Sequence, residues 1–73
     1  MNQNIDEPVS VNLDHNSLPS SVIWKNRFYE ITKIGFHHKY KTGETTIHVF
    51  SVTTQSMFLR LEMDSSNLLW KLT

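Results

Sequence analysis

The sequence predicts an all-β fold, a single antiparallel meander of five to six strands that curls into a small SH3-like partial barrel. Residues 27–40 and 45–52 are dense in β-branched and aromatic residues and flank a turn-forming segment, which is typical of a long hairpin. Shorter segments on both sides alternate apolar and polar residues, as half-buried strands do. Helical spacing of apolar residues does not persist beyond a few positions, so helix content near zero is expected.

The length and composition narrow the class of protein further. With 73 residues the chain has room for one small core, and we expect a disordered N-terminus at residues 1–5 and one β domain at residues 6–73. Cysteine is absent, which excludes disulfides, thiolate metal sites and cysteine nucleophiles. Nothing resembles a signal peptide or an apolar membrane span of roughly 18 to 20 residues, so a cytoplasmic protein without membrane contact is expected.

Two short strands are predicted ahead of the hairpin. Residues 7–13 alternate apolar and polar side chains, and Pro8 suits the first position of an edge strand, where no ladder donor is needed. Residues 14–17 form a loop by composition, Pro19 favours an extended Leu18, and a second strand follows at residues 20–24. Lys25-Asn26 then makes a tight turn, since Asn tolerates the positive φ that such turns require.

The turn at the far end of the hairpin determines its register. A type I turn over Lys41-Thr42 with Gly43 in a G1 bulge is the easier geometry, and it sets Tyr40 opposite Glu44. A two-residue loop at Thr42-Gly43 is the alternative. That loop would make His37 and His48 a direct cross-strand pair.

With the G1 bulge, Phe36 faces His48 and Ile34 faces Phe50. Turns near Thr54-Gln55 and at residues 64–67 carry this register into two further strands, pairing Phe50 with Leu59 and Leu61 with Trp70. One face then collects the predicted core: Ile34, Phe36, Phe50, Val52, Met57, Leu59, Leu61, Leu68, Trp70 and Leu72. Further apolar residues fall on the opposite face, so the sheet either closes into a barrel or is covered by a partner: Tyr29, Ile31, Ile47, Val49 and Phe58.

A series of short motifs is spread over residues 6–73. In chain order they are Glu7-Pro8-Val9-x-Val11, Pro19, Trp24-Lys25-Asn26-Arg27-x-Tyr29-x-Ile31, His48-Val49-Phe50-Ser51-Val52, Phe58-x-Arg60-Leu61 and Trp70-x-Leu72. The order of these motifs resembles that of a family of short bacterial all-β domains of unknown function, sometimes found near or fused to Y-family translesion DNA polymerases. That family typically has Gly at the position of Asn26, often has Trp near His37-His38, and continues past the final strand. The resemblance implies a β module without an established activity and an association with DNA-damage tolerance.

Three of the four histidines belong to the hairpin. In the G1 register His38 and His48 lie diagonally on one face, while His37 points to the other. Two histidines fall short of the three or four protein ligands of a zinc site, so we expect no metal and no cofactor, with the histidines making ordinary hydrogen bonds. Serines cluster in turns and no nucleophile with a base is visible, so the chain is not expected to be an enzyme.

Positive charge gathers on the first arm of the hairpin, although the whole chain has a formal charge of zero. Trp24, Tyr29 and Tyr40 interleave with these charges, which is typical of surfaces that bind single-stranded nucleic acid by stacking and electrostatic attraction. The candidate binding residues are Lys25, Arg27, Lys33, His37, Lys39, Tyr40 and Lys41.

A protein-interaction surface is the other prediction. The second apolar face and any open edge strand suit an unknown protein partner or self-association. The candidate interaction face consists of Ile31, Ile47, Val49 and Phe58. The expected function is therefore non-catalytic binding, with protein ahead of a role as a single-stranded nucleic-acid accessory module.

Overall fold

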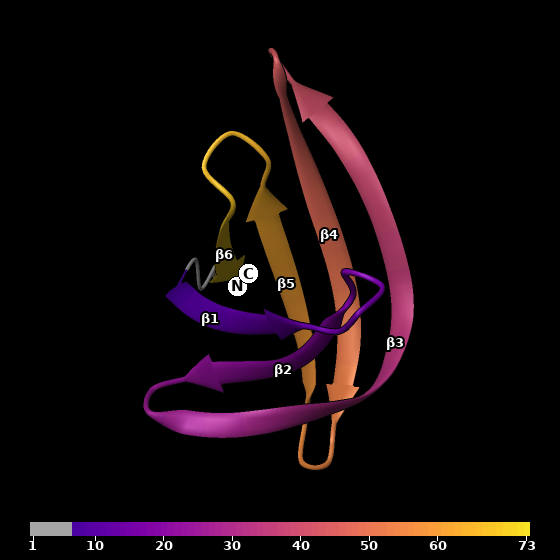
Figure 1. Cartoon of the computed structure of the whole chain (residues 1–73), viewed down its shortest axis with the longest axis vertical. Helices are drawn as coiled ribbons and strands as arrows, with labels where there is room; N and C mark the ends of the chain where they lie inside the picture. The colour runs from indigo at the N-terminus through magenta and orange to yellow at the C-terminus, as the bar shows by residue number, and fades with distance from the viewer. Residues whose placement is uncertain (1–6) are drawn as a thin grey trace, which may run out of the picture.

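Six antiparallel strands follow one another along the chain and close into a barrel (Figure 1). The computed structural model describes residues 7–73, so the predicted disordered segment at residues 1–5 lies outside the described residues. The strands are β1 (Glu7–Leu13), β2 (Pro19–Trp24), β3 (Arg27–Thr42), β4 (Thr45–Thr54), β5 (Phe58–Asp64) and β6 (Leu69–Leu72). The predicted all-β meander is confirmed.

The last strand returns to the first and closes the barrel. Glu7 pairs with Leu72 and Val9 with Trp70, while every other pairing joins strands that are consecutive in the chain. Because closure joins the first strand to the last, it also decides which apolar residues become internal. No segment within residues 7–73 forms a helix of the length and apolarity that crossing a bilayer requires.

Strand β3 is the longest strand and belongs to two parts of the barrel. Its first four residues pair with β2, and from Ile31 to Thr42 it pairs with β4. Bulges between Ile31 and Lys33 and between Ile34 and Phe36 interrupt this second ladder. Bulges bend a strand and increase its twist, which fits the pronounced curve of β3 in Figure 1. The β3–β4 hairpin therefore projects beyond the other strands at its tip.

The loop of this hairpin differs from the predicted one. Gly43 and Glu44 form a two-residue loop between the paired residues Thr42 and Thr45, and Gly43 has a φ of 63°. Tyr40 therefore lies opposite Ile47 instead of Glu44, and the G1-bulge register is wrong. The alternative of a two-residue loop had the right length but was displaced by one residue. A glycine at the first loop position supplies the positive φ that a type II′ turn needs there.

This displacement moves side chains between faces. The partner of Tyr40 shifts by three residues, and an odd shift inverts the face of every side chain because the period of a strand is two. Phe36, predicted to be in the core, is 56% exposed. The bulge just before it adds a residue to β3 and so restores the expected face of Ile34, which pairs with Val52 and packs against the core.

The later strands kept their predicted faces although their register also moved. Phe50 pairs with Leu61, and Leu61 pairs with Leu72, each two residues from the predicted partner. An even shift leaves side chains on the same face. The core cluster consists of Val22, Phe50, Val52, Leu59, Leu61 and Leu72.

Three differences from the predicted core remain after this shift. Val22 on β2 belongs to the core but was not predicted there. Met57 and Leu68 were predicted to be buried and are exposed, because both lie in turns outside the strands. Leu68 has a φ of 58°, which is typical of a turn position.

Candidate interaction surface on the long hairpin

Alternation divides the end of the β3–β4 hairpin into two faces. One face, which we call the groove face, carries Phe36, His38 and Tyr40 from β3. The other, which we call the core face, carries His37, Lys39 and Lys41. Contacts support the division, because His37 stacks on the core residue Phe50 whereas Tyr40 lines a groove on the outside of the barrel.

Three rings form a continuous row on the groove face. The ring centroids of Phe36 and His38 are 4.9 Å apart, and those of His38 and Tyr40 are 6.4 Å apart. Phe36 is 56% exposed and Tyr40 is 46% exposed. We call these three residues the aromatic strip. They follow one another at every second position of β3 because the strand is regular from Phe36 onward.

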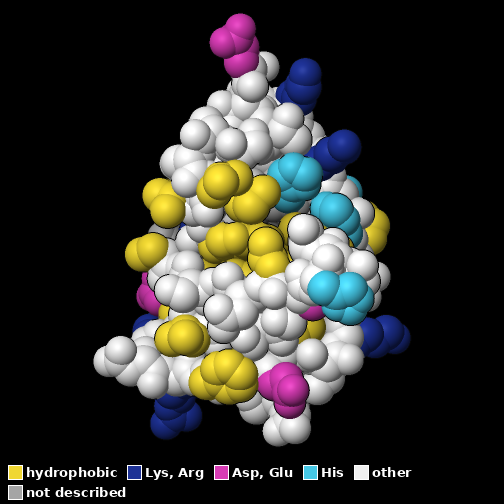
Figure 2. Space-filling model, in the orientation of Figure 1, with side chains coloured by type: hydrophobic (Ala, Val, Ile, Leu, Met, Phe, Trp, Pro, Cys, Tyr) yellow, Lys and Arg dark blue, Asp and Glu magenta, His cyan; other side chains and the backbone are white. Residues whose placement is uncertain are grey.

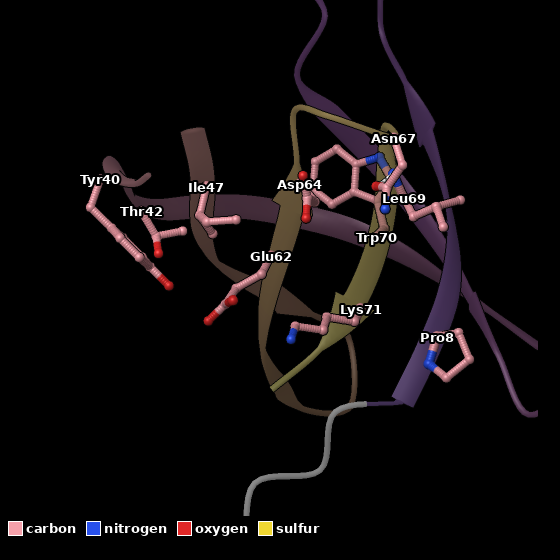
Figure 3. A pocket seen from close by; sticks show the side chains of 10 residues that line it. All are labelled: Pro8, Tyr40, Thr42, Ile47, Glu62, Asp64, Asn67, Leu69, Trp70 and Lys71. Atoms are coloured by element: carbon pink, nitrogen blue, oxygen red, sulfur yellow. Dashed lines mark hydrogen bonds between the residues drawn. The ribbon is translucent and has the colours of Figure 1, made fainter. Parts of the chain in front are cut away.

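A groove of about 420 Å³ begins beside the strip and crosses the outer face of the sheet. Figure 3 shows Tyr40 at one side of it and Pro8 at the other, with Glu62 and Lys71 between them. Its lining comes from five of the six strands and the β5–β6 turn: Pro8, Tyr40, Thr42, Ile47, Glu62, Asp64, Asn67, Leu69, Trp70 and Lys71. The groove therefore combines apolar, aromatic and charged side chains.

Two carboxylates on β5 contribute negative charge to this groove. Glu62 and Asp64 are two residues apart on one strand, which places both on the groove face. The Asp64 carboxylate accepts hydrogen bonds from the Ser66 hydroxyl at 2.6 Å and the Ser66 backbone N–H at 2.8 Å. These two bonds lower the pKa of Asp64, and the charge of Lys71 contributes less. Asp64 is therefore ionised at neutral pH.

The core face of the hairpin carries two imidazole rings next to the core residue Phe50, although His37 is exposed and His48 is half-buried. The His37 ring lies flat on Phe50, with centroids 4.0 Å apart and planes 9° apart. The centroids of the His37 and His48 rings are 5.8 Å apart. Figure 2 shows histidine side chains beside hydrophobic ones on the face of the molecule that it presents. Burial lowers the pKa of His37, and the charges of His48, Lys39 and His38 lower it further.

The histidine arrangement corrects the prediction. His37 and His48 share a face, and His38 points to the other, whereas the G1 register placed His38 and His48 diagonally on one face. The cause is again the odd displacement between β3 and β4. Among the residues that the structure describes, no three His, Asp or Glu side chains form a group that could hold a metal ion.

The predicted binding residues do not line one groove. Lys25 and Arg27 lie at the β2–β3 turn, where the Lys25 ammonium sits 5.0 Å from the centre of the Trp24 ring. Lys39 and Lys41 lie at the other end of β3, with their side chains on the core face. The remaining predicted residues are distributed as follows: Lys33 lies between the two bulges, His37 lies on the core face and Tyr40 lies on the groove face.

Two of the three aromatic residues predicted to stack on bases pack against the core instead. Trp24 and Tyr29 are partly buried and pack against the core, with their ring centroids 6.2 Å apart. The Trp24 indole N–H donates a hydrogen bond to the Glu7 carboxylate, which ties the end of β2 to β1. Tyr40 is the member of the predicted trio that is exposed.

The four residues of the predicted interaction face are separated in the structure. Ile31 packs against the core inside the barrel, and Val49 is 1% exposed between His38 and Glu62 on the outer face. Ile47 lines the groove, and Phe58 is 66% exposed at the start of β5. Closure of the barrel therefore explains why Ile31 packs against the core. The neighbouring side chains on the outer face explain why Val49 is buried.

Most residues that line the groove were not among the predicted binding residues. Glu62 and Asp64 carried a usable signal, because alternate residues of one strand share a face. Pro8 and Leu69 carried none, since only the β1–β6 pairing brings their strands together. The chain matches no protein-family model, no curated protein and no solved structure.

Proposed function

We propose that this chain is a non-catalytic protein-interaction module whose partner surface is the groove face of the β3–β4 hairpin. The observation that carries the proposal is the aromatic strip. Phe36 is 56% exposed and Tyr40 is 46% exposed, and with His38 between them they form a continuous row on one face of β3. Aromatic residues are enriched at the centres of protein interfaces, where they bury a large area on binding.

The strip and the groove together provide the two features that a partner needs. The rings of Phe36, His38 and Tyr40 offer a row of apolar area, and the adjoining groove offers a concavity with apolar walls at Ile47 and Leu69. Large exposed apolar patches with polar surroundings mark interaction sites in small domains. Leu69 is 66% exposed, so it too gains from being covered.

Charge favours protein over nucleic acid at this surface. Glu62 and Asp64 line the groove against a single cation, Lys71, so the groove has a net negative charge that repels a phosphate backbone. Lys39 and Lys41 lie on the other face of the same strand. Single-stranded nucleic acid is the second candidate, because a row of three rings on one strand is a geometry on which bases stack. The resemblance to domains near translesion polymerases makes DNA-damage tolerance the process in which to seek either partner.

The test compares capture of partners by two surface variants. The immobilised wild-type domain, the double variant Phe36→Ser/Tyr40→Ser and the control Phe28→Ser are exposed to lysate of the source cells, and the captured proteins are quantified. Phe28 is a matched control because it is 66% exposed on the far part of β3. We expect a captured protein that the double variant retains at least about tenfold less and the control retains equally, as loss of two aromatic contacts implies.

Two results would contradict this proposal. One is capture that is equal for the wild-type domain and the strip variant. The other is binding of labelled single-stranded DNA at low salt that weakens as salt rises and is lost in the strip variant, which would favour the nucleic-acid function instead.

A further inference from the structure

The β3 strand has an open edge along its second half. Its first four residues have β2 on one side, but within the described part of the chain residues 31–42 pair with β4 alone. The bulges occupy the stretch before Phe36, so residues 36–42 form the regular part of this edge. An unpaired edge presents free backbone donors and acceptors, to which an extended segment can add as a further strand.

The hairpin geometry identifies which backbone groups are available. In an antiparallel hairpin with a two-residue loop, the residues flanking the loop exchange both ladder hydrogen bonds, and bonded and non-bonded pairs then alternate. Thr42 and Thr45 flank the loop here. The backbone N–H and C=O groups of Lys41, Lys39 and His37 are therefore directed to the open edge.

The side chains of the edge differ between its two faces. Lys41, Lys39 and His37, whose backbone groups are free, have their side chains on the core face. The residues between them place the aromatic strip on the groove face. No acidic residue occurs in residues 31–42, so the edge carries only positive charge.

We propose that the open edge of β3 over residues 36–42 binds an extended peptide segment in which acidic and apolar residues alternate, added as a strand to the sheet. This inference rests on the proposed protein-interaction function and names the chemistry of its partner. The acidic side chains of the segment lie beside Lys39 and Lys41, and its apolar side chains lie beside Phe36 and Tyr40. Opposite charges on neighbouring strands stabilise such pairings, whereas like charges oppose them.

The same charge pattern argues against a second copy of the chain as the occupant. Antiparallel pairing of two β3 edges around a twofold axis at Lys39 places Lys39 against its own copy and Lys41 against His37. The Lys39 pair places like charges on neighbouring strands, and Lys41 gains no opposite charge from His37. Two copies therefore repel each other along this edge, whereas an acidic segment would neutralise its positive charges.

Fluorescence anisotropy with a defined probe tests this proposal. The probe is a labelled eight-residue peptide that alternates Glu and Val with blocked ends, and the control peptide replaces every Glu by Lys. We expect the wild-type domain to bind the Glu peptide and the Lys39→Glu/Lys41→Glu variant to bind it at least about tenfold more weakly. The same variant should instead bind the Lys peptide, which a misfolded domain would not do.

Backbone NMR on the same samples locates the peptide. Amide shifts on adding the Glu peptide should be largest at His37, Lys39 and Lys41. Absence of binding, equal binding by the charge-reversed variant, shifts centred on another strand, or a dimer that forms without peptide and covers these amides would each overturn the proposal. If the peptide fails to bind while the Phe36→Ser/Tyr40→Ser variant still loses a captured partner, the proposed function stands and this inference alone is wrong.

Discussion

His37 connects the exposed end of the hairpin with the core. Its ring covers one side of Phe50, and Phe50 in turn contacts Trp70 with ring centroids 5.5 Å apart. A stacked imidazole keeps polar nitrogens near solvent while its face contributes apolar contact. This position explains why burial, the largest cause, and the charge of His48 both oppose protonation of His37.

The first prediction concerns this titration. The pKa of His37, followed by NMR, should lie below the 6.5 of an unperturbed histidine, and His48→Gln should raise it part of the way back. Recovery should be partial because burial remains. Since the unfolded state binds the proton more readily, stability should fall as pH decreases from about 7 through the folded-state pKa.

His37→Gln is the control for this pH dependence. The variant should show a shallower loss of stability between about pH 7 and pH 5, measured by urea unfolding. A His37 pKa above 6.5, or one that His48→Gln lowers further, would contradict the described contacts.

The turn at Lys25-Asn26 is a second feature that residue chemistry determines. Both residues have positive φ, 53° and 64°, and they link the paired residues Trp24 and Arg27. The sequence predicted this two-residue turn correctly from Asn alone, because few residues tolerate the left-handed region.

The second prediction follows from these angles. Asn26→Gly should leave the domain as stable or raise its free energy of unfolding by about 0.5 kcal/mol, since glycine removes the remaining steric cost. Asn26→Val should lower it by about 1 to 2 kcal/mol, because a β-branched residue strongly disfavours this conformation. Urea unfolding of both variants measures the pair, and equal stability of the two would mean that the turn has another conformation.

At the scale of elements, strand identity was predictable and register was not. Alternation and turn residues located all six strands, because those signals are local. Register depends on loop length and bulges, and β3 has apolar residues on both sides of each bulge, so several alignments with β4 bury similar area. Two bulges between Ile31 and Phe36 then decide which side chains face inward. Nothing local in the sequence locates them.

The third prediction tests the register directly. Val49→Ala should destabilise the domain by about 2 kcal/mol because Val49 is 1% exposed, whereas Phe36→Ala should change stability by no more than about 0.5 kcal/mol. The predicted G1 register requires the opposite order, with Phe36 as the costly deletion. Denaturant unfolding of the two single variants therefore distinguishes the alignments.

For the whole molecule, the β1–β6 ladder holds the barrel closed. It joins the two ends of the described chain and completes the enclosure of the core. On folding, a domain of this size buries a smaller fraction of its surface than a larger domain does, so it has little stability to spare. The groove also depends on closure, because Pro8, Tyr40 and Leu69 come from parts of the chain that only the finished barrel brings together. Local sequence patterns therefore could not predict it.

The fourth prediction compares two leucines of β6. Leu72 is buried and pairs with both Leu61 and Glu7, so Leu72→Ala should cost about 2 to 5 kcal/mol and leave the domain partly or fully unfolded. Leu69→Ala is the matched control on the same strand, because Leu69 is 66% exposed and lies on the groove face. Circular dichroism and urea unfolding report both. Equal effects would mean that β6 does not close the core.

Both proposals need a regular β3 strand at the end of the hairpin, and the peptide-binding proposal also needs its edge to be open. Residue-resolved amide hydrogen exchange of the free domain tests both conditions most directly. We expect alternation, with slow exchange at His38 and Tyr40, whose amides bond to β4, and fast exchange at His37, Lys39 and Lys41. Uniform protection along residues 36–42 would show that the edge is already covered, and uniform fast exchange would show that the hairpin end is unpaired; either result would contradict the account.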